Sequence, residues 1–321
     1  MRVLFAGSPG IAVPALKALA AMDREAELAG VLTNPDSPRG RRERPEPTEV
    51  SAAAAVLSAG REARGLPPIV QLKPEKLSRE AREAAAALKL DLLLAFAYGR
   101  IFGPQFLSIF PLGGVNIHPS LLPRHRGASP IPAAILAGDR ETGITIQRIA
   151  AEMDTGDILV QERFPLSGRE TAASLSDLAA EKGARLVPPL LRGMAGGEAR
   201  AVPQRGEASY CSRLSKDDGL IDWNLAAAEI DARIRAYTPW PLAYTSQAGR
   251  ILYLLEGRPL EGEGRGGVPG TVLSAHKSLG ILIQTGGGVL ALTRLQYQAK
   301  KALFWKDFLN GAKDFIGARL G

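Results

Sequence analysis

The sequence predicts an α/β protein of two domains, a doubly wound parallel sheet followed by a small β-barrel. Three observations support this prediction. The chain has 321 residues, more than a single hydrophobic core usually serves. Its first part alternates short apolar strands with helical segments, as parallel sheets do. Its last part carries short alternating segments between glycine-rich turns, which is typical of small barrels.

The chain opens with an apolar strand at Arg2–Ala6, a glycine-containing turn and a helix from Pro14, where proline suits a first helical turn. Gly7 and Gly10 form G-x-x-G rather than the G-x-G-x-x-G of dinucleotide-binding folds, and no G-x-x-x-x-G-K-[ST] occurs. We interpret the glycines as a tight turn between strand and helix, and not as a nucleotide site.

A second strand at Leu28–Thr33 precedes a segment with four prolines, Asn34–Glu49, which we expect to be an exposed loop. Its tip is basic: Arg39, Arg41, Arg42 and Arg44 face a single acidic residue within 39–44. Charge runs usually form solvated surface, but a long basic loop can also reach into nucleic acid. The sequence leaves both interpretations open.

The alternation continues to about residue 191. We expect helices at 50–60, 78–89, 103–110, 128–137 and 171–191, and strands at 68–71, 91–96, 115–118, 142–149 and 158–164. The glycine-rich segment 193–209 has no periodicity and predicts a linker. We therefore expect a first domain at 1–203, ending in that linker, and a second at 210–321.

The second domain should contain a helix at 225–237 and strands at 250–255, 270–274, 280–284 and 289–296. Its last 28 residues hold six lysines and arginines, Lys300 and Lys301 among them, against two aspartates. The whole chain carries a net charge of +7. This charge permits an anionic partner without requiring one.

Composition excludes several classes of protein. No apolar run approaches the roughly 18 residues that cross a bilayer. Cys211 is the only cysteine, so an intrachain disulfide and a thiolate metal cluster are excluded, and we read it as a packed small residue. The three histidines lack the spacing of a zinc site. We expect a cytoplasmic protein with no metal and no membrane partner.

The residues most suggestive of chemistry lie in GGVNIHPSLLPRHRG, residues 113–127, and MDTGD, residues 153–157. Alternation places Asn116 and His118 on one face at a strand's carboxyl end, where open α/β sheets bind ligands. An asparagine can hold an oxyanion, a histidine can move a proton, and Asp154 could orient the ring. No enzyme nucleophile accompanies them, so a substrate should supply it. Each residue could instead be structural, shaping a turn or a hydrogen bond.

These motifs, N-I-H-P-S-L-L-P-R-H-R-G-A-S-P-I and M-D-T-G-D-I, resemble the signature of the formyltetrahydrofolate-dependent formyltransferases. The basic insert T-N-P-D-S-P-R-G-R-R, Y-C-S-R-L-S-K-D-D-G-L-I-D-W, I-R-A-Y-T-P-W-P and D-F-L-N-G narrow the resemblance to the methionyl-tRNA formyltransferase family. The similarity spans nearly the whole chain, whereas the related glycinamide ribonucleotide formyltransferases lack this second domain.

The resemblance implies a Rossmann-like catalytic domain, a flexible linker and an OB-like barrel that helps to hold transfer RNA. It implies formyl transfer from the co-substrate 10-formyltetrahydrofolate to initiator methionyl-tRNA. We expect a monomer, although the sequence itself does not give the oligomeric state. The matched positions imply three functional groups of residues: Asn116, His118 and Asp154 for catalysis; Ser120, Leu121, Leu122 and Pro123 for folate; and Arg39, Arg41, Arg42, Arg44, Lys300 and Lys301 for transfer RNA.

The sequence departs from the family at His125, where tryptophan is common, and at Arg39, Arg42 and Arg44, where glycine and lysines are common. The packing of the first loop and the share of each arginine in binding therefore stay open. Three alternatives are also considered: a formyltransferase for a small amine or sugar nucleotide, a non-catalytic RNA-binding protein, and a nicotinamide oxidoreductase, which the missing glycine fingerprint disfavours.

Overall fold

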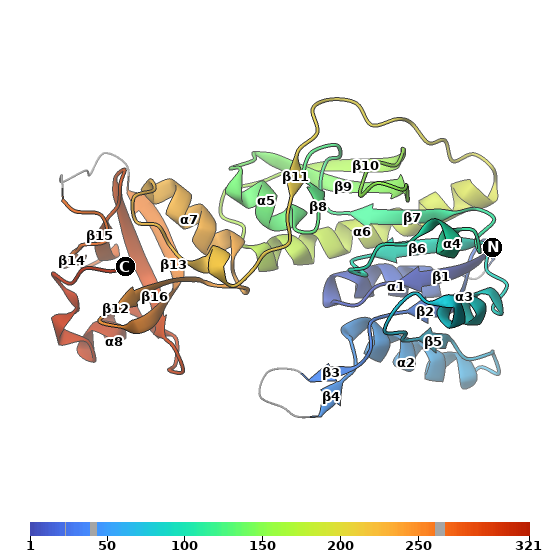
Figure 1. Cartoon of the computed structure of the whole chain (residues 1–321), viewed down its shortest axis with the longest axis horizontal. Helices are drawn as coiled ribbons and strands as arrows, with labels where there is room; N and C mark the ends of the chain where they lie inside the picture. The colour runs from blue at the N-terminus through green and yellow to red at the C-terminus, as the bar shows by residue number, and fades with distance from the viewer. Residues whose placement is uncertain (23, 39–43, 261–266) are drawn as a thin grey trace. The chain divides into compact units, whose positions relative to one another are not determined.

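The computed structural model describes residues 1–22, 24–38, 44–260 and 267–321, which form two compact units (Figure 1). The first unit comprises Met1–Pro130, Glu141–Pro165 and Ser176–Cys211. The second comprises Ile131–Arg140, Leu166–Leu175 and Ser212–Gly321. Each unit has its own sheet and its own core.

A seven-stranded sheet forms the centre of the first unit. In spatial order its strands are β10 (Ile158–Pro165), β9 (Glu141–Arg148), β7 (Gly114–His118), β6 (Leu92–Phe96), β1 (Arg2–Ala6), β2 (Glu27–Leu32) and β5 (Val70–Leu72). The five strands from β7 to β5 are parallel, whereas β9 runs antiparallel to β7 and β10 antiparallel to β9. The sheet therefore has the predicted parallel core, with two antiparallel strands at one edge.

The antiparallel pairing of β9 with β10 follows from the length of their connection. Parallel neighbours need a crossover of a dozen or more residues, but only nine residues separate β9 from β10. These residues contain MDTGD, so the motif lies in a hairpin loop and not in a strand-to-helix crossover.

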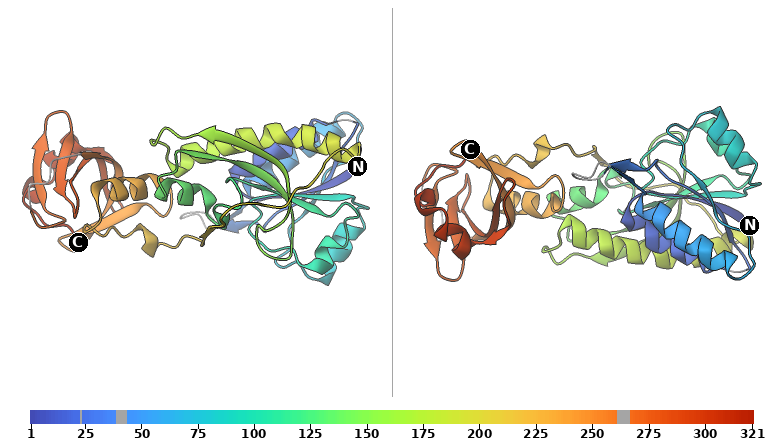
Figure 2. Two further views of the ribbon diagram at one scale, coloured as in Figure 1. Left: turned by 90° about the horizontal axis from the view of Figure 1, so that it is seen from above. Right: turned by 90° about the horizontal axis from the view of Figure 1, so that it is seen from below.

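Helices cover both faces of the sheet, which confirms the doubly wound, Rossmann-like prediction (Figure 2). The α-helices of this part of the chain are α1 (Val13–Ala20), α2 (Glu49–Glu62), α3 (Arg79–Ala86), α4 (Pro104–Leu107) and α6 (Ala172–Ala195). α3 and α4 pack on one face through a cluster that includes Ala85 and Phe106. On the other face, α6 approaches the sheet closely, because a Cβ on Gly183 would lie 3.3 Å from Ile117.

Caps in the sequence set two of these helices. The Thr48 side chain accepts a hydrogen bond from the Ser51 amide at the start of α2, and Ser78 does the same for Ala81 at the start of α3. Between β2 and α2, β3 (Ser37–Pro38) pairs with β4 (Pro45–Glu46). The predicted loop therefore contains a short two-stranded ladder, whose tip, residues 39–43, lies outside the described residues.

The second unit is built on an antiparallel sheet, as predicted for the C-terminal domain. Its strands are β12 (Ala243–Gln247), β13 (Arg250–Leu260), β16 (Val289–Tyr297), β15 (Gly280–Gln284) and β14 (Val272–His276), with β17 (Leu303–Phe304) pairing to β16. Helix α7 (Ala227–Ala236) packs on this sheet through Ile230 and Ile234, both fully buried or nearly so. β12 and helix α8 (Trp305–Asn310) were not predicted from the sequence.

Two further features bear on the site. The short strand β8 (Arg126–Gly127) pairs in parallel with β11 (Tyr210–Cys211), so the segment after α6 returns to the loop that follows β7. Helix α5 (Pro130–Leu136) follows that loop. Among the helices formed by described residues, none combines the length and apolar character needed to cross a membrane.

Candidate active site

Strand β7 delivers two polar side chains to the carboxyl end of the sheet. Val115 and Ile117 are buried between neighbouring layers, and the alternate positions carry Asn116 and His118. Asn116 lies beside Gln147 of β9, and His118 lies beside Thr145. The predicted side-by-side placement of Asn116 and His118 on one face follows from this register.

Asp154 reaches the same place from the β9–β10 loop. Its backbone is left-handed, with φ of 56°. Two positions on, a Cβ on Gly156 would lie 1.8 Å from the Arg148 carbonyl oxygen, so only glycine allows the loop to fold back this tightly. The loop thus turns Asp154 toward β7 although 38 residues separate it from Asn116.

Four groups surround the Asp154 carboxylate. Oδ1 accepts a hydrogen bond from Gln147 Nε2 at 2.8 Å and lies 3.4 Å from Asn116 Nδ2. Oδ2 accepts from the Gly127 amide at 2.9 Å and lies 3.5 Å from His118 Nδ1. The structure therefore brings Asn116, His118 and Asp154 together in one small constellation.

His118 faces a hydrogen-bond acceptor on each ring nitrogen. Nε2 lies 2.9 Å from the His125 carbonyl oxygen, which can only accept, so Nε2 carries a hydrogen. Nδ1 faces Asp154 and is the position left for a second proton. The ring is only 4 % exposed, and this burial lowers the pKa of His118, opposed by the Asp154 charge and the His125 carbonyl. Burial is the largest of these effects, so the site favours the neutral form of the ring.

The loop of Ser120 to Pro123 is held from inside the protein. Ser120 is fully buried, and its hydroxyl donates to the Arg124 carbonyl at 2.7 Å. Thr145 Oγ1 donates to the Ser120 carbonyl at 2.7 Å and accepts from the Leu122 amide at 3.2 Å. The side chains of Ser120 and Leu122 are therefore used for packing, and Leu121 is the half-buried side chain of the four.

Gly127 is a site residue that the sequence did not single out. It has φ of 118°, and a Cβ there would lie 2.1 Å from the Cys211 carbonyl oxygen. Its amide nevertheless donates to Asp154, so the close approach of two backbones positions a donor to the carboxylate. The glycine ending the long motif was the available signal, but nothing in the sequence named its partner.

The predicted RNA-binding residues are placed less completely. Arg39, Arg41 and Arg42 lie outside the described residues, and Arg44 is exposed beside β4. Lys300 and Lys301 are exposed in the turn between β16 and β17 of the second unit. Close to that turn, Phe304 is 59 % exposed and the Arg294 guanidinium lies 5.7 Å from its ring centre, a pairing suited to stacking on bases.

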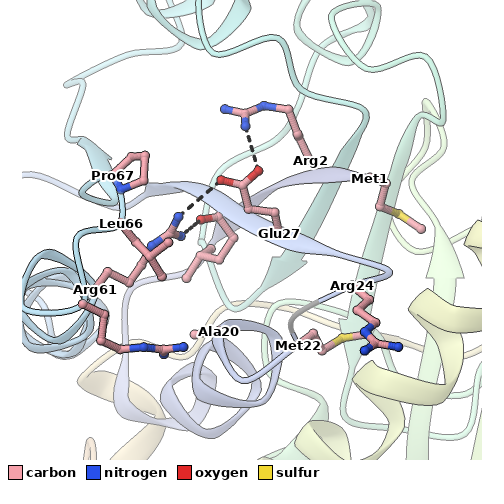
Figure 3. A pocket seen from close by; sticks show the side chains of 11 residues that line it. Met1, Arg2, Ala20, Met22, Arg24, Glu27, Arg61, Leu66 and Pro67 are labelled. Atoms are coloured by element: carbon pink, nitrogen blue, oxygen red, sulfur yellow. Dashed lines mark hydrogen bonds and ion pairs between the residues drawn. The ribbon is translucent and has the colours of Figure 1, made fainter.

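A cavity of about 410 Å³ lies at the opposite, amino-terminal edge of the parallel strands (Figure 3). Two of the arginines that line it serve the fold, because Arg2 and Arg61 both bind Glu27, at 2.7 and 3.3 Å. Arg61 also donates to the Leu28 carbonyl at 2.7 Å. These bonds hold the start of β2, and the cavity is separate from the group formed by Asn116, His118 and Asp154. The described residues contain no group of three histidine, cysteine or acidic side chains placed to bind a metal.

Comparisons with known proteins identify the family of this chain. The sequence matches the family described as "Formyl transferase" over residues 1–191 and that described as "Formyl transferase, C-terminal domain" over residues 213–313. A methionyl-tRNA formyltransferase of Treponema denticola is 47 % identical over 323 residues, covering 98 % of each chain. One of Pseudomonas entomophila is 38 % identical, covering 100 % of this chain and 99 % of the other.

Solved structures share the fold at lower identity. HypX from Aquifex aeolicus in complex with tetrahydrofolic acid gives a TM-score of 0.63 at 20 % identity, over 98 % of this chain and 48 % of HypX. The sugar 3N-formyl transferase WlaRD gives 0.64 at 17 %, over 94 % of this chain and 99 % of the other. A methionyl-tRNA formyltransferase from Clostridium thermocellum gives 0.56 at 15 %, over 82 % and 95 %.

Proposed function

Because this chain belongs to the formyl transferase family, we propose that it transfers the formyl group of 10-formyltetrahydrofolate to the α-amine of methionine esterified to initiator transfer RNA. The relatives that carry the name methionyl-tRNA formyltransferase match almost end to end at 38–47 % identity. The sugar formyl transferase shares the fold at 17 % identity, so a sugar nucleotide or another small amine is the less favoured acceptor.

The observation that carries the proposal is the convergence of Asn116, His118 and Asp154. An amide donor, a neutral buried base and a carboxylate meet at the carboxyl end of a strand, without a nucleophilic side chain in the group. This set suits the attack of a substrate amine on a carbonyl carbon, because such a reaction needs an oxyanion donor and a proton carrier.

In the proposed mechanism the methionyl amine attacks the formyl carbon, forming a C–N bond and a tetrahedral oxyanion. Asn116 Nδ2 donates a hydrogen bond to that oxygen. The attacking nitrogen loses its proton to His118, directly or through a water. Nδ1 receives it, since Nε2 already donates to the His125 carbonyl. Asp154 stabilises the resulting imidazolium.

Collapse of the intermediate breaks the bond between the formyl carbon and folate N10. The proton held at His118 Nδ1 passes to N10, which leaves as tetrahydrofolate. His118 returns to its neutral form, and no atom or electron is left unbalanced. The depressed pKa of His118 favours this cycle, because the ring must be neutral at its start.

The substrates are assigned to surfaces by the same proposal. Backbone groups of residues 120–123, with Leu121 as the less buried side chain, would contact the folate. The loop arginines Arg39, Arg41, Arg42 and Arg44 and the lysines Lys300 and Lys301 would contact RNA phosphates. We further propose catalytic and RNA-binding domains at 1–203 and 210–321 and a monomeric, cytoplasmic enzyme.

The test is formyl transfer from 10-formyltetrahydrofolate to methionyl initiator transfer RNA, with an aminoacylated elongator transfer RNA, free methionine and an amino-sugar nucleotide as parallel acceptors. We expect rapid transfer to the initiator species and slow transfer to the others. Preferred formylation of the sugar nucleotide would replace the proposed acceptor. Binding of RNA without folate-dependent turnover would favour the non-catalytic alternative.

A further inference from the structure

A row of side chains leads from the surface of the first unit to the Asp154 carboxylate. Arg126 donates from Nε and from an Nη atom to Gln204 Oε1, at 3.1 and 2.7 Å. Gln204 Nε2 donates to Gln147 Oε1 at 3.1 Å, and Gln147 Nε2 donates to Asp154 Oδ1 at 2.8 Å. Two glutamines thus connect an arginine to the carboxylate beside His118.

The chemistry of the two ends fixes the direction of this row. An arginine only donates, so it selects the oxygen of the Gln204 amide and turns its nitrogen inward. An ionised carboxylate only accepts, so it selects the nitrogen of the Gln147 amide. Each amide therefore has one orientation, and donors point toward Asp154 at every step. Reversing either amide would set oxygen against oxygen.

Gln204 also holds the backbone on which Asp154 is carried. The same Nε2 lies 2.9 Å from the Asp154 carbonyl oxygen and 2.8 Å from that of Gly156, so its two hydrogens are shared among three acceptors, of which Gln147 Oε1 is the most distant. Asp154 has the left-handed backbone described above, which costs energy in a residue other than glycine and persists only where neighbours hold it. The Gln204 amide therefore holds the backbone of the 154–156 loop. It also orients Gln147, whose amide binds the Asp154 carboxylate.

Gln204 comes from the segment that the sequence predicts to be a linker. In the structure this segment is bonded to the first unit at several points. Val202 forms an antiparallel bridge with Ile158, and the Ser209 hydroxyl accepts from the His125 amide at 2.9 Å. Arg126, which orients Gln204, is itself bonded to Tyr210 at 2.9 Å. The segment thus forms part of the wall around His118 and Asp154.

We propose that Gln204 is a positioning residue for the reaction, which holds Asp154 against His118 through Gln147 and through the backbone of the 154–156 loop. This proposal rests on the proposed formyl transfer for its kinetic consequences but not for its structural ones. Gln204 acts through other residues and does not itself touch the reacting atoms. Its loss should reduce the rate of the chemical step and leave substrate affinity nearly unchanged.

Two substitutions at Gln204 distinguish the effect of its amide donor from the effect of the size of its side chain. Gln204→Met keeps the length of the chain without donors, and Gln204→Glu keeps the pairing with Arg126 but sets a carboxylate against three acceptors. The matched control is Gln105→Met, because Gln105 is exposed and also accepts a hydrogen bond from an arginine, Arg82. All three variants are made in the full chain, and thermal unfolding verifies that each one folds.

The kinetic arm measures kcat and KM for methionyl initiator transfer RNA and for the folate. We expect kcat to fall on the order of 10- to 100-fold in both Gln204 variants, as misplaced catalytic groups typically cause, with KM changed by less than about threefold. Gln105→Met should match the wild type. Unchanged kcat in folded Gln204→Met would overturn the proposal, and so would a rise in KM that accounts for the whole loss.

The second arm needs no substrate. The chain has three histidines, so ring signals can be assigned by NMR and the pKa of His118 followed directly. The groups that face this ring are Asp154 and His125, and the Asp154 charge supports protonation. In Gln204→Met the carboxylate should drift away and the pKa of His118 should fall further. An unchanged His118 titration would overturn the proposal even if the wild type proved inactive toward transfer RNA.

Discussion

Replacing Asn116 by alanine tests the proposed oxyanion donor with little disturbance of the fold. Among the described residues, the Asn116 amide forms one side-chain hydrogen bond, to Asp154, and its length of 3.4 Å exceeds the usual 2.7–3.2 Å range of N–H···O bonds. The residue is only partly buried. Its side chain therefore contributes little to stability, and a strong effect on the reaction would have to arise in the transition state.

The magnitude follows from these contacts. Removing an oxyanion-hole donor typically costs about 10²–10³ in kcat, equivalent to about 2.7–4 kcal/mol of transition-state stabilisation. Removing a long, partly exposed hydrogen bond should change the free energy of unfolding by less than about 1 kcal/mol. For a unit of this size, that corresponds to a shift in Tm of no more than about 2–4 °C.

Thr145→Val provides the opposite pattern for comparison. Thr145 is fully buried, and its hydroxyl bonds the Ser120 carbonyl, the Leu122 amide and Gln161 at 2.7, 3.2 and 2.9 Å. Leaving those partners unpaired should cost about 1–3 kcal/mol of stability.

The assay pairs single-turnover formyl transfer with calorimetric unfolding for both variants. Asn116→Ala should transfer the formyl group more slowly with a nearly unchanged Tm, whereas Thr145→Val should unfold at a lower Tm. Near-normal turnover by Asn116→Ala would remove the residue from the proposed role, and a large fall in its Tm would show that the amide supports the fold instead.

Three further predictions concern the loop, the ring and the second unit. Gly127→Ala should destabilise the protein by about 1–3 kcal/mol, because the new Cβ would lie 2.1 Å from a backbone carbonyl oxygen. The control is Gly60→Ala, which should be neutral or stabilising because Gly60 lies inside α2 with open space around it. Urea unfolding measures both changes. Burial lowers the pKa of His118 in the folded protein below its ordinary value of 6.5. Just below pH 6.5 the unfolded chain therefore binds more protons than the folded protein does. The contribution of His118 to the free energy of unfolding is thus complete above pH 6.5 and is lost as the pH falls toward the folded pKa. Unfolding free energies at pH 7.5 and 5.5 should therefore differ less in His118→Gln than in the wild type, and parallel curves would contradict this. Replacing Lys300 and Lys301 by alanine should raise KM for charged transfer RNA and flatten its salt dependence, with kcat for the bound substrate retained; unchanged RNA kinetics would leave these lysines as solvated surface.

The sequence was sufficient where one physical constraint decided the outcome. Alternation in β7 forces Asn116 and His118 onto one face whatever surrounds them, and fully apolar β6 requires a strand covered on both sides. The shared face of Asn116 and His118 and the sheet were predictable for this reason. The hairpin around MDTGD was predicted as two bracketing strands, but their antiparallel placement depended on pairing partners that periodicity does not specify.

The remaining features depended on contacts between distant backbones. Gln204 lies in a stretch without periodicity, and its neighbours in sequence carry no sign that its amide reaches Asp154, 50 residues away. Gln147 is nearly fully buried and therefore needs partners, but it follows the alternation Ile144-Thr145-Ile146 in β9, so its sequence position does not mark it. Helix α6 continues to Ala195 through Pro188 and Pro189, past its predicted end at residue 191.

The Asp154 carboxylate and the His125 carbonyl, which face the two nitrogens of the His118 ring, help to explain how a buried histidine could serve this reaction. Burial disfavours the imidazolium, while Asp154 and the His125 carbonyl favour it, so the opposing effects are built into one site. A ring that is neutral at rest can accept the proton of an attacking amine. The same ring, once protonated, is stabilised by a carboxylate that is already in place, so little reorganisation is needed at that moment. On this proposal the rate depends on the position of Asp154, so Gln204, which holds Asp154, should matter for turnover.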